Sequence, residues 1–149
     1  VLSTIHTNDA VTAIPRLLDL KLDAFLLSSA LTAVIAQRLV RKICPSCKIE
    51  YSITDEEREL LTSHHLEKRL AFRGVGCPKC NHTGYLGRLV ISEVLPMNDQ
   101  IRQMIFEGAS TGIIVATARK HGMTSMLEDG LSKAVEGLTT IAEVIRVAG

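Results

Sequence analysis

The architecture of this chain depends most on two matching stretches, CPSC at residues 44–47 and CPKC at residues 77–80. They contain all four cysteines of the sequence, Cys44, Cys47, Cys77 and Cys80. Two thiolates separated by two residues on a tight turn can bind one face of a tetrahedral zinc ion, and a second such pair completes a four-sulfur shell. Because a closed shell of thiolates leaves no open position for water or substrate, the spacing predicts a structural zinc site.

Other interpretations of the cysteines fit the pattern less well. A thioredoxin-like redox motif needs only one pair with a reactive thiolate, and unligated buried cysteines need no duplicated motif. His64, His65 and His82 are the competing ligands, but we expect each to be a solvated surface histidine. The 29 residues between the two pairs exceed the roughly 15–20 of a compact zinc ribbon. The metal is therefore predicted to hold together the two ends of residues 48–76. We call this stretch the excursion and expect it to be helical.

Composition limits the fold and the partners of the chain. Hydrophobic residues make up 46% of the 149 residues, but only three Phe, two Tyr and no Trp contribute, so Leu, Ile, Val and Ala fill the interior and favour helix packing. The 17 Lys and Arg nearly balance the 16 Asp and Glu, which disfavours general nucleic-acid binding. No apolar run approaches the roughly 18 residues that a membrane-spanning helix needs.

The first 44 residues predict alternating strands and helices. Residues 1–5 (VLSTI) are apolar and β-branched, as in a buried strand, and the next helix is expected to begin one to three residues before Pro15. Asp23 can cap a second helix, predicted over residues 24–36 and buried on most of its circumference. The alternating pattern that follows predicts a short strand from residue 37 to Cys44.

The middle of the chain carries clear start and stop signals. Residues 54–57 (TDEE) have the T-x-x-E form of a capping box, which predicts a short charged helix. Gly84 and Gly87 are predicted to bracket a tight turn, and residues 89–95 to form a strand that ends before Pro96.

The remaining residues predict helices. Asn98 or Asp99 is a start signal, and residues 140–143 form a second T-x-x-E box that opens the last helix. Three glycines fall where helices would stop: Gly108, Gly122 and Gly137.

Three sequence blocks, taken together with the cysteine pairs, resemble the GspE and PilB type of ATPase. The first is STIHTNDA at residues 3–10, similar to the histidine box of that family, and the second comprises RLLD at 16–19 and AQRLVRKICP at 36–45. The third runs from TGYLGR at 83–88 through Ile91 and Glu93, and EDGL at 128–131 and GLTT at 137–140 resemble the terminal helices. The departures are Lys21, where the family often has Gly, and Leu86 and Val90, which replace a basic residue and a Gly.

The resemblance implies a hexameric motor with a RecA-like core that hydrolyses ATP, with magnesium, to power type II protein secretion or type IV pilus assembly. Such a motor is cytoplasmic and passes movement to an inner-membrane platform protein, through which it is peripheral to that membrane. His6 would sense the γ-phosphate, whereas a structural interpretation makes it a cap of the strand–helix turn. An imidazole at the end of a strand suits the first role, because ligands of open α/β sheets gather there.

The fold expected on this basis is mainly α with short β strands. Residues 1–43 would form the C-terminal edge of a RecA-like α/β ATPase core, residues 44–80 the tetracysteine zinc subdomain, and residues 81–149 a mainly helical C-terminal portion.

An ATPase of this kind needs a G-x-x-x-x-G-K-[ST] loop to hold phosphates, but none of the ten glycines here is followed by Lys. The chain alone, a fragment beginning at the histidine box, is therefore predicted neither to bind ATP appreciably nor to hydrolyse it. Two alternatives remain open: a self-standing zinc-binding protein-interaction adaptor, and a zinc-ribbon nucleic-acid binder. The second is supported only by the cysteine pairs and a basic run, Arg38, Arg41, Lys42 and Lys48.

Overall fold

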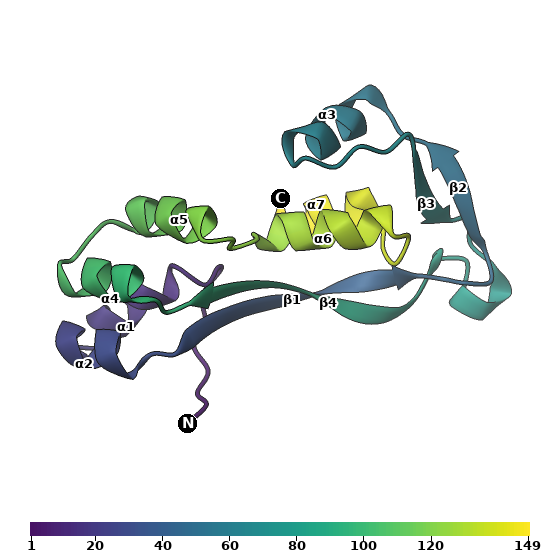
Figure 1. Ribbon diagram of the computed structural model, residues 1–149. Coiled ribbons are helices and arrows are strands. Elements are labelled where there is room, and N and C mark those ends of the chain that lie inside the picture. Colours follow the sequence, from purple (N-terminus) through teal and green to yellow (C-terminus); the bar gives the residue numbers. More distant parts are fainter. The chain divides into compact units, whose positions relative to one another are not determined.

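The computed structural model describes all 149 residues, which form two compact units, each built from two separate stretches. Unit 1 comprises Val1–Gln37 and Glu93–Ser125, and unit 2 comprises Arg38–Ser92 and Met126–Gly149. The strands β1 (Ala33–Ile43) and β4 (Tyr85–Pro96) pair with each other, and both contribute residues to each unit (Figure 1). None of the helices has the length and apolar content that crossing a membrane would require.

Unit 1 contains four helices: α1 (Ala13–Asp19), α2 (Ala24–Ala30), α4 (Asp99–Phe106) and α5 (Thr111–Lys120). The caps predicted for two of them are confirmed. The Asp23 carboxylate accepts the first free N–H groups of α2, and the Asn98 side chain accepts the Ile101 N–H at 2.8 Å. Helix α1 begins two residues before Pro15, as expected.

The predicted helix over residues 24–36 is wrong in its second half and in its burial. Helix α2 ends at Ala30, Leu31 is extended, and β1 begins at Ala33. The β-branched residues that follow, among them Val34 and Ile35, favour a strand over a helix. Phe25 is 63% exposed, so α2 is not buried on most of its circumference.

The strand predicted at residues 1–5 is also wrong, because this stretch has no regular structure and Val1 and Leu2 are fully exposed. A strand requires a neighbour for its backbone hydrogen bonds. The two sheets of the structure, β1–β4 and β2–β3, provide no neighbour for these residues. Further along, Lys21 adopts a left-handed backbone with φ 62° at the end of α1, the conformation that favours glycine.

Unit 2 includes the excursion between the two cysteine pairs. The strands β2 (Lys48–Ser52) and β3 (Leu70–Gly74) pair antiparallel, with Lys48 opposite Gly74, and α3 (Asp55–Ser63) lies between them in sequence. The capping box of Thr54 and Glu57 is confirmed at the start of α3. The two five-residue strands were not predicted, since only a helical excursion was expected.

The last two helices of unit 2, α6 (Met126–Val135) and α7 (Ile141–Ala148), pack against each other. Their contact is close, because a Cβ at Gly130 would lie 2.6 Å from Cγ1 of Val144. They share a core with β3 and the residues around α3, made by Ile53, Leu61, Ala71, Leu131, Ala134, Ile141 and Val144.

The strand predicted over residues 89–95 is confirmed, but β4 begins earlier, at Tyr85, and it includes Pro96 instead of ending before it. Gly84 precedes the strand, whereas Gly87 lies inside it with φ 82°. A glycine with this backbone inside a strand is typical of a β-bulge rather than of the predicted tight turn. The fold as a whole mixes helices with short strands around a cluster of four cysteines.

Candidate metal centre

The two cysteine pairs form one cluster in unit 2. The Sγ atoms of Cys44, Cys47, Cys77 and Cys80 all lie within 4.8 Å of one another. The Sγ–Sγ distances are 3.9 Å for Cys44–Cys77, 3.9 Å for Cys47–Cys80 and 3.7 Å for Cys77–Cys80. Zn–S bonds of about 2.3 Å in a tetrahedron place neighbouring sulfurs about 3.8 Å apart. The spacing and the all-thiol donor set therefore fit a tetrahedral zinc ion.

Both cysteine pairs are folded into tight turns by their own backbone. The Cys47 N–H donates to the Cys44 carbonyl at 3.3 Å, and the Cys80 N–H donates to the Cys77 carbonyl at 3.1 Å. In the second pair, residues Pro78–Cys80 form a short 3₁₀ turn whose first residue is the proline, with its preset φ and no N–H to satisfy. This local geometry directs both thiols of a pair to the same side.

The surroundings of Cys47 and Cys80 shift the pKa values of their thiols in opposite directions. Burial raises the pKa of Cys47 to about 11. Burial also opposes ionisation of Cys80, but backbone N–H groups of Cys77 and Gly84 donate to its Sγ at 3.2 and 3.3 Å, and the pKa falls to about 6. Because metals bind thiolates, loading the complete set of cysteines releases protons.

Two glycines allow the second pair to approach the end of β3. A Cβ at Gly84, whose φ is 80°, would lie 2.5 Å from the Gly74 carbonyl oxygen, and one at Gly74 would overlap the Gly84 carbonyl group. The Val75 N–H also donates to the Cys47 carbonyl at 3.1 Å. The base of the β2–β3 excursion therefore lies at the cysteine cluster.

None of the competing histidines joins this cluster. His65 and His82 are exposed, in agreement with the prediction. His64 is not simply solvated, because its side chain is 19% exposed and Nδ1 lies 3.4 Å from Oε1 of Glu128. It contributes to the packing of α3 beside α6 instead.

His6 lies in unit 1, exposed, on the irregular stretch before α1. The turn that follows it is well defined: Asp9 Oδ1 accepts the Thr12 N–H at 2.8 Å, and Oε1 of Glu93 accepts the Ala10 N–H at 2.9 Å. Glu93 is only 7% exposed. Sequence reasoning did not find this contact, although an acid at an inward position of a buried strand was a usable signal.

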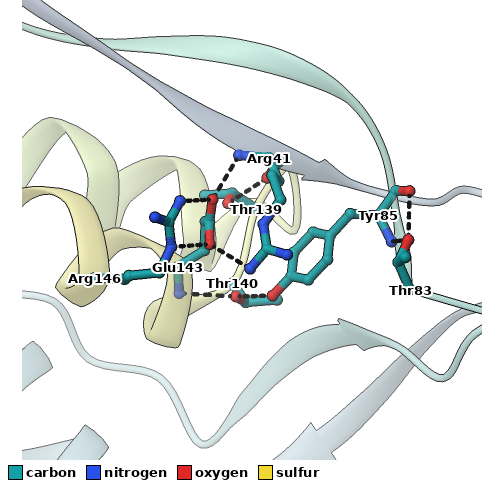
Figure 2. Close-up of polar contacts among 7 residues, drawn as sticks. All are labelled: Arg41, Thr83, Tyr85, Thr139, Thr140, Glu143 and Arg146. Atoms are coloured by element: carbon teal, nitrogen blue, oxygen red, sulfur yellow. Dashed lines mark hydrogen bonds and ion pairs between the residues drawn. The ribbon is translucent and has the colours of Figure 1, made fainter.

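A second set of polar contacts in unit 2 was also missed. We call it the Glu143 cluster, and it comprises Arg41, Tyr85, Thr139, Thr140, Glu143 and Arg146 (Figure 2). The Glu143 side chain is fully buried and holds ion pairs with Arg41 and Arg146 at 2.7 and 2.6 Å. These pairs keep the pKa of Glu143 well below its usual range: the Arg146 hydrogen bond is the largest cause, burial opposes it, and Arg41 adds to it.

The sequence matches the family described as Type II/IV secretion system protein over residues 1–146. It is 44% identical over 147 residues to the Type II secretion system ATPase E of Vibrio cholerae, covering 99% of this chain and 29% of that protein. It is 42% identical over 147 residues to the Type IV pilus assembly ATPase PilB of Thermus thermophilus, covering 97% of this chain and 16% of that protein. The chain thus spans less than a third of the length of these relatives. It belongs to the Type II/IV secretion system protein family.

Proposed function

We propose that this chain is the C-terminal part of a hexameric ATPase that powers type II protein secretion or type IV pilus assembly. The observation that carries the proposal is the family match over residues 1–146, at 44% identity to a type II secretion ATPase. The parent protein would be the enzyme. The chain by itself would not hydrolyse ATP, because its sequence lacks the Gly-Lys step of a phosphate-binding loop.

Within that proposal, three parts of the chain have separate roles. Residues 1–43 would complete the edge of a RecA-like ATPase core, residues 44–80 would form the zinc subdomain, and residues 81–149 would form the helical end. His6 would sense the γ-phosphate, and its exposed position leaves the imidazole accessible to a nucleotide held by another part of the parent. The parent would act in the cytoplasm and pass its movement to an inner-membrane platform protein.

The four cysteines would hold one structural zinc ion. Sulfur spacings of 3.7–3.9 Å and the absence of a non-cysteine ligand support this role over a catalytic one. Bound zinc would supply a tetrahedral cross-link between residues 44–47 and 77–80. The chain's own residues would then hold the base of the β2–β3 excursion in one arrangement.

A chimera tests the proposed motor role. The matching region of the Vibrio cholerae type II secretion ATPase E is replaced by this chain, and ATP hydrolysis by the purified, zinc-loaded protein is measured. The chimera is expected to hydrolyse ATP, and His6→Ala is expected to lower the rate roughly 100-fold or more, the loss typical when a group that stabilises transition-state charge is removed. His82→Ala, at another exposed histidine, serves as the matched control and should leave the rate unchanged.

Two results would contradict the proposal. A chimera that folds and binds zinc but does not hydrolyse ATP would show that this chain cannot fulfil the proposed role in the motor. Appreciable ATP binding by the chain alone, lost with His6→Ala, would show that the phosphate-binding loop is not needed.

A further inference from the structure

The Glu143 carboxylate is buried and fully engaged. Oε1 accepts the backbone N–H of Arg41 at 3.0 Å, and the Arg41 guanidinium donates to Oε2 at 2.7 Å. Nε and Nη2 of Arg146 donate to the two oxygens at 2.8 and 2.6 Å. One side chain of α7 therefore binds both its own helix and strand β1 (Figure 2).

The same segment completes the outer edge of β1 immediately before the first cysteine. Oγ1 of Thr139 donates to the Arg41 carbonyl at 2.8 Å, and the Ile43 N–H donates to the Leu138 carbonyl at 2.9 Å. Cys44 is the next residue along the chain. The residues just before α7 thus supply hydrogen-bond partners that a neighbouring strand would otherwise provide, and they hold the backbone that leads into the metal cluster.

The Glu143 cluster also contacts β4, the strand that follows the second cysteine pair. The Tyr85 hydroxyl lies 2.8 Å from Oγ1 of Thr140, and the Arg41 guanidinium carbon lies 4.1 Å from the centre of the Tyr85 ring. Tyr85 directly follows Gly84, whose N–H donates to the Cys80 thiol at 3.3 Å. The start of α7 therefore contacts the chain on both sides of the cysteine cluster.

We propose that the Glu143 cluster is a positioning device for the tetracysteine site, so that docking of α7 and metal binding strengthen each other. Metal affinity depends on how well the surrounding shell orients the ligands, and removing such support typically weakens it about 10–100-fold. Coupling between two equilibria is reciprocal, so the metal must hold α7 in place by the same free energy with which α7 favours the metal. The inference rests on the proposed zinc site.

Competitive zinc titration of the whole chain against a chromophoric chelator tests the first half of the coupling. Glu143→Gln is expected to raise the zinc dissociation constant roughly 10–100-fold. Glu57→Gln, which changes the same kind of residue in the other capping box, should leave it near the wild-type value. Wild-type affinity in Glu143→Gln, or an equal loss in Glu57→Gln, would overturn the inference.

Hydrogen–deuterium exchange of the unmodified chain tests the second half, and it does not depend on whether a variant folds. Removing zinc with a chelator is expected to speed exchange in α7 (Ile141–Ala148) more than in α3 (Asp55–Ser63) of the same unit. Unchanged exchange in α7 would overturn the coupling while leaving the zinc site intact. A wild-type chain that binds no zinc would contradict the proposed site itself, and the inference would fall with it.

Discussion

The two T-x-x-E boxes of this protein share a motif, but their glutamates have different surroundings. Glu57 caps the start of α3, accepting the Thr54 N–H at 3.0 Å and the Tyr51 hydroxyl at 2.7 Å. The Glu143 carboxylate instead pairs with two arginines, Arg41 and Arg146, and its side chain is buried. In both boxes the threonine does what the motif predicts. The motif therefore determines the cap, whereas contacts distant in sequence determine the role of the glutamate.

The largest expected difference in stability is between two variants that each remove one glutamate charge, Glu143→Gln and Glu57→Gln. Glu143→Gln loses charge-assisted hydrogen bonds in a buried setting and should lower the free energy of unfolding by about 2–3 kcal/mol. Glu57→Gln retains an oxygen that can accept at the exposed box, so its effect should be clearly smaller. Urea unfolding of both variants at one fixed zinc concentration measures the two losses. Equal losses would show that the two boxes do not differ.

Acid should narrow the gap in stability between the wild type and Glu143→Gln. The folded pKa of Glu143 is depressed, so its contribution is fully present above the unfolded value of about 4.3 and is lost as the pH falls through the folded pKa. Unfolding followed from pH 7 to pH 3 should show a constant gap down to about pH 5 and a shrinking one below it. Acid also releases metal from thiolates, and the proposed coupling makes this release differ between the two proteins, so zinc retention is measured at each pH and the gap is compared where both proteins keep their metal. A gap that stays constant to pH 3 would contradict the assignment.

The two capping threonines provide a closer comparison. Thr54→Ala removes one helix cap and should cost about 1 kcal/mol. Thr140→Ala removes a cap and also the partner of the Tyr85 hydroxyl, so it should cost about 2 kcal/mol. Thermal unfolding of the two variants under identical conditions gives the difference. If Thr54→Ala proved the more harmful, the buried box would not have the additional role proposed for it.

The smallest expected effect belongs to Tyr85. Tyr85→Phe loses the hydroxyl contact with Thr140 but keeps the aromatic ring beside the Arg41 guanidinium, so the loss should be about 1 kcal/mol or less. Zinc titration of this variant is expected to show a weaker but measurable decrease in affinity. A decrease as large as that of Glu143→Gln would place the main support of the site on Tyr85 instead.

Local signals predicted much of the fold. Asp23, Thr54 and Asn98 correctly marked the starts of helices, because the atoms that make each cap are only a few residues apart. The four-cysteine cluster joins residues 33 apart in sequence, and it was predicted because the same two-cysteine motif occurs twice.

Other features depend on neighbours that local sequence does not reveal. Residues 31–36 are apolar enough for a buried helix, but they enter a strand that pairs with β4, and the Thr32 carbonyl accepts the N–H of Met97, 65 residues further along the chain. Residues 1–5 have strand composition but no strand beside them. The carboxylates of Glu93 and Glu143 accept N–H groups that are 83 and 102 residues away in sequence. The residue pattern of a single helix or strand cannot reveal such contacts.

The zinc content of the purified chain tests the central claim most directly. Elemental analysis under reducing conditions should give about one zinc per chain, and a Cys77→Ser, Cys80→Ser variant should lose both the metal and helical content measured by circular dichroism. A wild-type chain without metal, together with a variant that folds like it, would contradict the metal centre and the coupling to α7 built on it.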